Sequence, residues 1–285
     1  MSIRITSPGL YSDIPNADYH RDPVDGGSLS SSGARALLPP SCPARFRWHQ
    51  DHGQTSTDHF DFGHAAHQLV LGVGDPIAII DADDWRTKAA KEARDEARAS
   101  GHIPLLADDM LIVEAMADAL REHPVANALL APGTGLPEQT LVWRDATTEV
   151  MCRARIDWLP HRTAGRRLII PDYKTCHSAE PEALRRAMAQ FGYHQQADWY
   201  LTAARALDLA GADAAFVFIC QEKVAPYLVT IFEPDPIALR IAAERNYMAR
   251  AVYRRCVEAG HWPAYVDGVA QLALPLWVER QEGVA

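Results

Sequence analysis

The sequence predicts an α/β fold of the α+β type, in which a central mixed β-sheet is flanked by helices. Helical patterns dominate the first part of the 285-residue chain, and three runs rich in Val, Ile, Leu and Trp follow them. A helix, two more strand-like runs and a long helix complete the order. Because strands and helices do not alternate regularly, this order favours a helix–sheet sandwich over a doubly wound nucleotide-binding fold.

Residues 1 to about 60 are rich in Ser, Pro, Gly and Asp, so we expect them to be largely irregular. The exception is SLSSSGARALL (28–38), where a serine cap precedes a short helix. CPARFRWH (42–49) can continue this helix after a proline break.

Three helices are expected next. The segment 61–72 has Phe62, Ala66, Leu69 and Val70 at helical spacing. The alanine-rich segment 84–101 has mixed charges typical of a solvated helix, with Gly101 as its stop. The segment 107–124 is amphipathic and ends at a proline.

The runs 138–144, 149–159 and 166–175 predict a three-stranded meander, because turn signals separate them. The segment 178–211 is expected to be helical, with a break near Phe191 and Gly192. Two strands at 214–222 and 225–234 and a long closing helix at 236–260 follow, and the remaining tail is expected to be irregular.

The chemistry is concentrated between residues 149 and 175. Asp157 lies near the end of one predicted strand, and Asp172 and Lys174 lie two residues apart on the next, so these two share a face. Apolar neighbours and the strand-edge signal of Pro171 indicate partly desolvated carboxylates, which a bound cation would compensate. Two carboxylates and an ammonium at a sheet edge suit metal-assisted phosphodiester cleavage. The alternative is a surface ion pair at the end of a strand.

Other polar residues are less informative individually. His64 and His67 are neighbours on one helix face, although a single histidine is more often structural than metal-binding. Tyr193, Gln196 and Tyr200 form a stripe on a later helix, which an ordinary half-exposed helix face explains equally well.

Composition limits the classes of function. The formal net charge of −9 weighs mildly against a DNA partner, so any contact with nucleic acid must be local. The five cysteines form no CxxC pair, which favours reduced thiols in a cytoplasm and argues against a structural zinc or iron–sulfur site. No apolar run is long enough to predict a membrane span, and the N-terminus lacks a signal-peptide core. Basic residues cluster locally at Arg35, Arg45 and Arg47, at Arg166 and Arg167, and at Arg185 and Arg186.

Taken together, the motifs resemble the PD-(D/E)XK nuclease superfamily, and within its RecB-like branch the phage and prophage exonuclease VIII (RecE) type. GHAAH (63–67), RARID (153–157), PDYKT (171–175) and YHQQADWY (193–200) occur in the order of that family, across about residues 10 to 265. Asp stands where Glu is commoner before x-Lys. The cysteines of iron–sulfur relatives and a Walker A sequence are absent, so neither that cluster nor a helicase motor is expected.

The resemblance implies a restriction-endonuclease-like core and a site for Mg²⁺ or Mn²⁺. The implied metal ligands are His67, Asp157, Asp172, the carbonyl of Tyr173 and Glu138. It also implies that Lys174 is the catalytic lysine and that Gln196 and Tyr200 position the scissile strand. Arg153 and Arg155 flank Asp157 on its strand, and we expect at least one of them to contact phosphate.

The resemblance further implies an exodeoxyribonuclease that degrades linear double-stranded DNA from 5′ ends without ATP in phage-type recombination. It implies a ring-shaped homo-oligomer working beside a strand-annealing protein, and a division into an N-terminal extension (1–60), a nuclease core (61–265) and a tail (266–285). Two alternatives remain open: an endonuclease or accessory repair or defence nuclease, and a module that binds DNA or protein without cutting. The intact set of Asp157, Asp172 and Lys174 disfavours the second.

Overall fold

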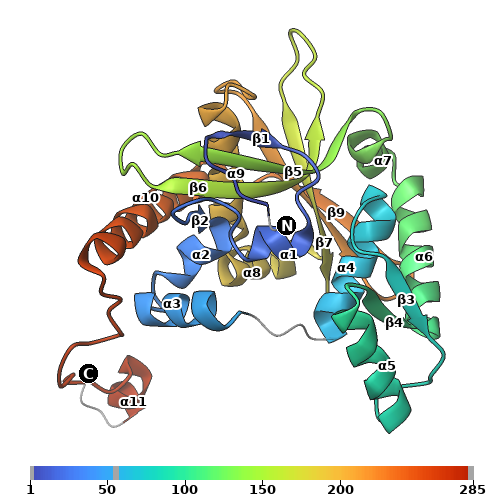
Figure 1. Cartoon of the computed structure of the whole chain (residues 1–285), viewed down its shortest axis with the longest axis horizontal. Helices are drawn as coiled ribbons and strands as arrows, with labels where there is room; N and C mark the ends of the chain where they lie inside the picture. The colour runs from blue at the N-terminus through green and yellow to red at the C-terminus, as the bar shows by residue number, and fades with distance from the viewer. Residues whose placement is uncertain (1–2, 54–57, 282–285) are drawn as a thin grey trace.

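Two mixed β-sheets with helices around them form the body of the computed structural model, which describes residues 3–53 and 58–281 (Figure 1). The first sheet has the order β1-β5-β6-β2 and is built around β5 (Gly135–Arg144) and β6 (Met151–Pro160). The second has the order β7-β8-β9, formed by β7 (Ile169–Cys176), β8 (Ala215–Glu222) and β9 (Val229–Phe232). The predicted class, mixed sheets flanked by helices, is confirmed.

The expectation of a largely irregular N-terminal region was wrong. Strands β1 (Gly9–Tyr11) and β2 (Leu29–Ser30) complete both edges of the first sheet, β1 antiparallel to β5 and β2 parallel to β6. Three helices accompany them: α1 (Asn16–His20), α2 (Ser31–Ala36) and α3 (Pro43–His52). Strands this short show no readable periodicity, which is why the composition of the region suggested a loop. The Ser30 cap of α2 was predicted correctly, since its side chain accepts from the Gly33 amide.

The predicted meander is correct for its first two strands only. β5 and β6 form a continuous antiparallel ladder, whereas β7 pairs in parallel with β8. β6 and β7 nevertheless lie side by side, and we call the line between them the β6–β7 junction (Figure 1). β7 is an edge strand of its sheet, as the proline at position 171 suggested.

A group of helices packs beside the second sheet and contacts β7, and a small parallel pair of strands packs against these helices. The elements in order are α4 (Asp58–Leu71), β3 (Ile77–Ile80), α5 (Lys88–Ala99), β4 (Ile103–Leu106), α6 (Ala107–Glu122) and α7 (Pro124–Leu130). The three longer helices confirm the periodicity read from the sequence. The β3–β4 pair was not predicted, because each strand has only four residues.

The apolar residues form two main clusters, which lie on opposite faces of the strands around the β6–β7 junction. One packs β5 and β6 against α9 and β8, with Trp143 and Trp199 in edge-to-face contact. The other packs α4, α6 and α7 against Trp158, Tyr173 and Ile219. Residues that border the junction are therefore surrounded by apolar side chains on both sides.

Gly192 separates α8 (Pro181–Phe191) from α9 (Tyr193–Ala206), as the sequence predicted. Its φ of +69° lies in the left-handed region that favours glycine. The break redirects the chain so that the start of α9 faces β7.

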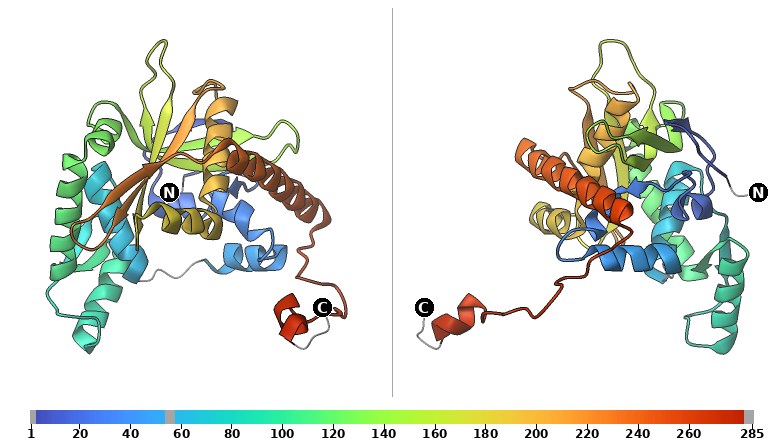
Figure 2. Two further views of the ribbon diagram at one scale, coloured as in Figure 1. Left: turned by 180° about the vertical axis from the view of Figure 1, so that it is seen from behind. Right: turned by 60° about the vertical axis from the view of Figure 1, so that its left-hand side comes forward.

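The chain ends with α10 (Pro236–Ala259), an extended segment and α11 (Leu276–Gln281). Both views in Figure 2 show this last part running away from the body. Val269 and Leu272 on it are almost fully exposed. No helix in the described ranges is both long and apolar enough to cross a membrane.

Candidate metal centre

A side-chain hydrogen bond connects the two sheets at the β6–β7 junction. The Tyr173 backbone amide on β7 donates to Asp157 Oδ2 on β6 over 2.9 Å. The Asp157 carboxylate thus takes the place of a ladder carbonyl, and it lies beside Asp172 on the neighbouring strand. Asp157 is 9% and Asp172 only 1% exposed, so burial raises the pKa of both carboxyls.

Asp172 is held by two partners. Lys174 Nζ lies 2.5 Å from Asp172 Oδ2, which confirms that these side chains share a face of β7. Gln196 Nε2, on the first turns of α9, donates to Asp172 Oδ1 over 2.6 Å. Burial, with the charge of Asp157, raises the pKa of Asp172 to about 6. Burial alone would lower the pKa of Lys174, but the charges of Asp172 and Asp157 raise it, so the ammonium stays protonated.

His67 approaches from α4, whereas its helix neighbour His64 is exposed. His67 Nε2 lies 2.7 Å from the Tyr173 carbonyl oxygen, and Nδ1 lies 3.7 Å from Asp157 Oδ2. Burial and the nearby Lys174 lower the pKa of His67 to about 4, so the imidazole is neutral at pH 7. A neutral imidazole is the form that binds metal ions.

Glu138 reaches the site through an unusual backbone conformation. It faces Asp157 across the β5–β6 pair, between the register partners Pro137–Trp158 and Gln139–Ile156. Its φ of +51° is rare for a glutamate, and such conformations persist where the surroundings enforce them. Burial and the charge of Asp157 raise the pKa of Glu138 to about 7.

These side chains fit a divalent cation. His67, Glu138 and Asp157 each offer a ligand atom, and the three atoms lie within 4.8 Å of one another. His67 Nε2 and the Tyr173 carbonyl oxygen, which lie 2.7 Å apart, would both be among the ligands of such an ion. Carboxylates, a carbonyl and an imidazole suit Mg²⁺ or Mn²⁺. Burial is the main cause of the raised pKa values of Asp172 and Glu138, and a bound cation would favour their charged forms.

Tyr200 lies one turn of α9 beyond Gln196, with its ring edge-on to Phe216. Burial raises its pKa well above the ordinary value, and the nearby charges of Asp172 and Asp157 contribute. The phenol is therefore neutral and can act as a hydrogen-bond donor next to the two acids.

The two arginines of β6 are held by the protein itself. Arg153 is 3% exposed, and its Nη1 lies 3.0 Å from Asp22 and donates to both oxygens of Ser28. Arg155 is 9% exposed; it donates to the Ile14 carbonyl and lies 3.3 Å from Glu138. The contact of Arg153 or Arg155 with phosphate stays a prediction. Arg153 has a structural role, and of the two only Arg155 borders the metal ligands.

Sequence reasoning missed the residues that support these arginines. The Tyr19 ring lies 4.2 Å below the Arg155 guanidinium and also contacts Arg153. Asn16 lies 3.4 Å from Arg155 Nη1. Both come from α1, more than a hundred residues away along the chain, and no spacing pattern signals such a contact.

The profile of one protein family matches residues 30–274 of the chain, and its description reads PDDEXK-like domain of unknown function, DUF3799. The chain belongs to this family. Membership of the PDDEXK-like group confirms the broad part of the resemblance, and the finer assignment to the exonuclease VIII type stays a prediction. The DUF3799 match covers β2 through the extended segment that precedes α11.

One solved structure supports this fold. The DUF3799 chain is similar to the crystal structure of a candidate exonuclease from Eubacterium rectale, with a TM-score of 0.59 and 11% sequence identity over 92% of this chain and 94% of that one. A crystal structure named SSO0001 matches at a TM-score of 0.35 and 13% identity, over 78% of this chain and 75% of that one. No curated protein is significantly similar in sequence. At such identities the first match shows the fold alone.

Proposed function

We propose that this DUF3799 protein is a metal-dependent deoxyribonuclease that degrades linear double-stranded DNA from its ends. The observation that carries the proposal is the convergence of Asp157, Asp172 and Lys174 with His67 and the Tyr173 carbonyl at the β6–β7 junction. A module that only binds DNA has no need to bury two carboxylates beside an ammonium, because that arrangement is costly without a cation.

The residues have separate tasks in the proposed reaction. His67, Asp157, Asp172, Glu138 and the Tyr173 carbonyl would hold Mg²⁺ or Mn²⁺. When bound, such an ion lowers the pKa of a water molecule and offsets negative charge on phosphate. Lys174 stays protonated next to Asp172, so its ammonium can stabilise charge that develops on the phosphate oxygens.

Gln196 and Tyr200 orient the other groups. The amide of Gln196 donates to Asp172 Oδ1, which fixes the carboxylate rotamer and leaves Oδ2 facing Lys174. Tyr200 keeps its proton and offers an O–H next to the site. We assign both residues to positioning rather than to proton transfer.

Cutting from DNA ends, as opposed to internal cutting, is supported by the motif resemblance and by the structural likeness to a candidate exonuclease. The same resemblance leads us to propose 5′ polarity, independence from ATP, a ring-shaped oligomer and cooperation with a strand-annealing protein.

A comparison of linear and covalently closed circular DNA tests the proposal. We expect the wild type with Mg²⁺ or Mn²⁺ to consume linear duplex and to leave circles intact, with no requirement for ATP. Nicked circles would indicate an endonuclease instead. Intact linear DNA with both metals, in a preparation that takes up Mn²⁺ by calorimetry, would contradict the nuclease assignment. The Lys174→Ala variant serves as the negative control.

A further inference from the structure

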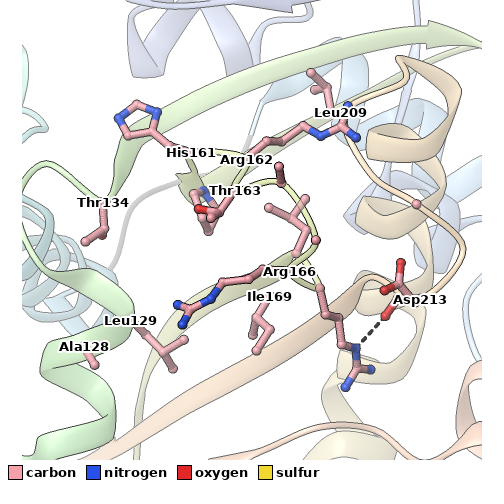
Figure 3. Close-up of a pocket in the computed structure, with 16 residues that line it drawn as sticks. Ala128, Leu129, Thr134, His161, Arg162, Thr163, Arg166, Ile169, Leu209 and Asp213 are labelled. Atoms are coloured by element: carbon pink, nitrogen blue, oxygen red, sulfur yellow. Dashed lines mark hydrogen bonds between the residues drawn. The ribbon is translucent and has the colours of Figure 1, made fainter.

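A cavity of about 680 Å³ lies at the loop that joins β6 to β7, away from the metal centre. The loop (161–168) forms one wall, α7 forms a second, and the segment before β8 forms a third. Figure 3 shows the Arg166 side chain extending from the loop into the space in front of α7. Arg166 and Arg167 form one of the basic clusters noted in the sequence, and neither residue takes part in the proposed reaction.

The charges that line this cavity are not balanced. Arg167 is neutralised, because its guanidinium lies 2.6 Å from Glu233 and donates to the Asp213 carbonyl. Arg162 donates a hydrogen bond to the Asp208 carbonyl over 3.0 Å. Because a backbone carbonyl carries no net charge, this bond does not neutralise the guanidinium. In the described part of the chain, no acidic side chain pairs with Arg166.

Among the described residues, Arg162, Arg166 and the Asp213 carboxylate line the cavity without an ion-pair partner, so two positive charges face one negative charge in a chain whose net charge is −9. Such a local concentration of positive charge in a concave surface attracts anions strongly. Guanidinium groups bind phosphate oxygens in a bidentate manner. The volume lies within the range of about 300–1,000 Å³ that is usual for ligand pockets, so the cavity has room for more than a single phosphate.

The position of the cavity relates it to the metal centre. Pro160 and Ile169 line it, and they lie three residues from Asp157 on β6 and from Asp172 on β7. At about 3.3 Å per residue, the near edge of the cavity is about 10 Å along the strands from the two acids. Successive phosphates of one DNA strand advance by about 3.4 Å along the helix axis, so this span corresponds to about three nucleotides.

We propose that the cavity is a second phosphate-binding site, in which Arg162 and Arg166 each contact the DNA backbone, at one or two phosphodiesters about three to six nucleotides from the cut. This inference rests on the proposed function and extends it. In this proposal the accessible Arg162 and Arg166, instead of the buried Arg153, contact the DNA backbone.

The test is a scan with neutral linkages. Single methylphosphonates, which remove the charge of one phosphate, are placed at each of about the first ten linkages from one end of a duplex. Binding is measured by anisotropy in Ca²⁺ with the full chain. The proteins compared are the wild type, R166Q, the double variant R162Q/R166Q, and the control R4Q/R121Q, which removes two exposed arginines paired on the surface elsewhere.

We expect the double variant to bind unmodified duplex about tenfold more weakly near 0.1 M salt, with a salt slope smaller by about two. The control should retain the affinity of the wild type. In the wild type, one or two linkages about three to six nucleotides from the end should be sensitive to neutralisation, and in the double variant these should be insensitive. R166Q, whose side chain has no described ion-pair partner, should show half of the effect with an unchanged thermal midpoint.

Two results would overturn the inference. One is a scan in which the same linkages stay sensitive in the wild type and in the double variant. This result would show that the loop arginines do not contact the DNA. The other is millimolar inorganic phosphate binding that depends on Arg162 and Arg166 without any sensitive linkage, which would make the cavity a site for free phosphate. Binding in Ca²⁺ requires no cutting, so the inference can fail in a protein that digests DNA and can hold in one that does not.

Discussion

Replacing Glu138 with glutamine should make the metal-free protein more stable at high pH. The carboxyl is buried beside Asp157 and its pKa is raised from 4.5 to about 7. Between these two values the folded protein holds a proton that the unfolded chain has lost, so the stability of the wild type falls as pH rises through this window. Glutamine has no proton to lose, and E138Q should not show that fall.

The size of the effect follows from the pKa values. At about 1.4 kcal/mol per pH unit, the rise from 4.5 to about 7 corresponds to at most about 3.5 kcal/mol in the free energy of unfolding. The Glu138 side chain is 33% exposed, and screening by solvent reduces this to about 1–2 kcal/mol. Loss of the Arg155 ion pair opposes the gain, but Arg155 keeps its bond to the Ile14 carbonyl.

Urea unfolding followed by circular dichroism in EDTA measures the effect at pH 5 and pH 8. The advantage of E138Q over the wild type should increase by about 1 kcal/mol between these conditions. Saturating Mg²⁺ should reverse the order, because the wild type gains about 2.7 kcal/mol at a hundredfold excess over Kd, whereas the variant lacks one ligand.

Glu149→Gln is a matched control. Glu149 also has a positive φ, +57°, and also faces an arginine, Arg144, but its side chain is 59% exposed. We expect no pH-dependent difference for this variant. An E138Q advantage that is equal at both pH values, or a variant less stable at both, would show that the ion pair with Arg155 outweighs burial.

Other variants separate chemistry from structure. Lys174→Ala should keep Mn²⁺ uptake in calorimetry but lose two or more orders of magnitude in cutting, about the cost of removing a charge that acts on the transition state; failure to take up Mn²⁺ would contradict this role. Asp172→Ala should lose both uptake and cutting. Arg153→Ala should cost about 3–5 kcal/mol in urea unfolding, because Asp22 is left largely buried without its cation; a cost below about 1 kcal/mol would refute the structural role. Gly192→Ala should lower the thermal midpoint, since its Cβ would lie 2.3 Å from Arg35 Cδ at a φ of +69°.

Short sequence patterns predicted those features of the site that depend on residues close together in the sequence. The i, i+2 spacing placed Lys174 next to Asp172, and the Phe191–Gly192 break placed Gln196 where it reaches β7. The long helices followed from their periodicity. In each case the interaction that fixes the geometry spans only a few residues, so the pattern is present in the printed sequence.

Long-range geometry was not predictable in this way. The parallel pairing of β7 with β8 depends on the α8–α9 connection, which places β8 next to β7. The turn signal between the runs 149–159 and 166–175 suggested instead that β7 pairs with β6 in a hairpin. The burial of Arg153 depends on Asp22 and Ser28, which lie more than 120 residues earlier in the sequence and which β2 brings next to β6. The left-handed backbone of Glu138 is imposed by its surroundings and has no signature in residue type.

The bond from the Tyr173 amide to Asp157 gives the metal centre a spectroscopic reporter. In a regular sheet this N–H would exchange with solvent only when the ladder opens, but here its protection depends on one carboxylate that is also a candidate metal ligand. A cation that draws on Asp157 should therefore alter the chemical shift and deuterium exchange of that single amide. Metal occupancy of the site thus becomes visible in the backbone, in an experiment that contains no DNA.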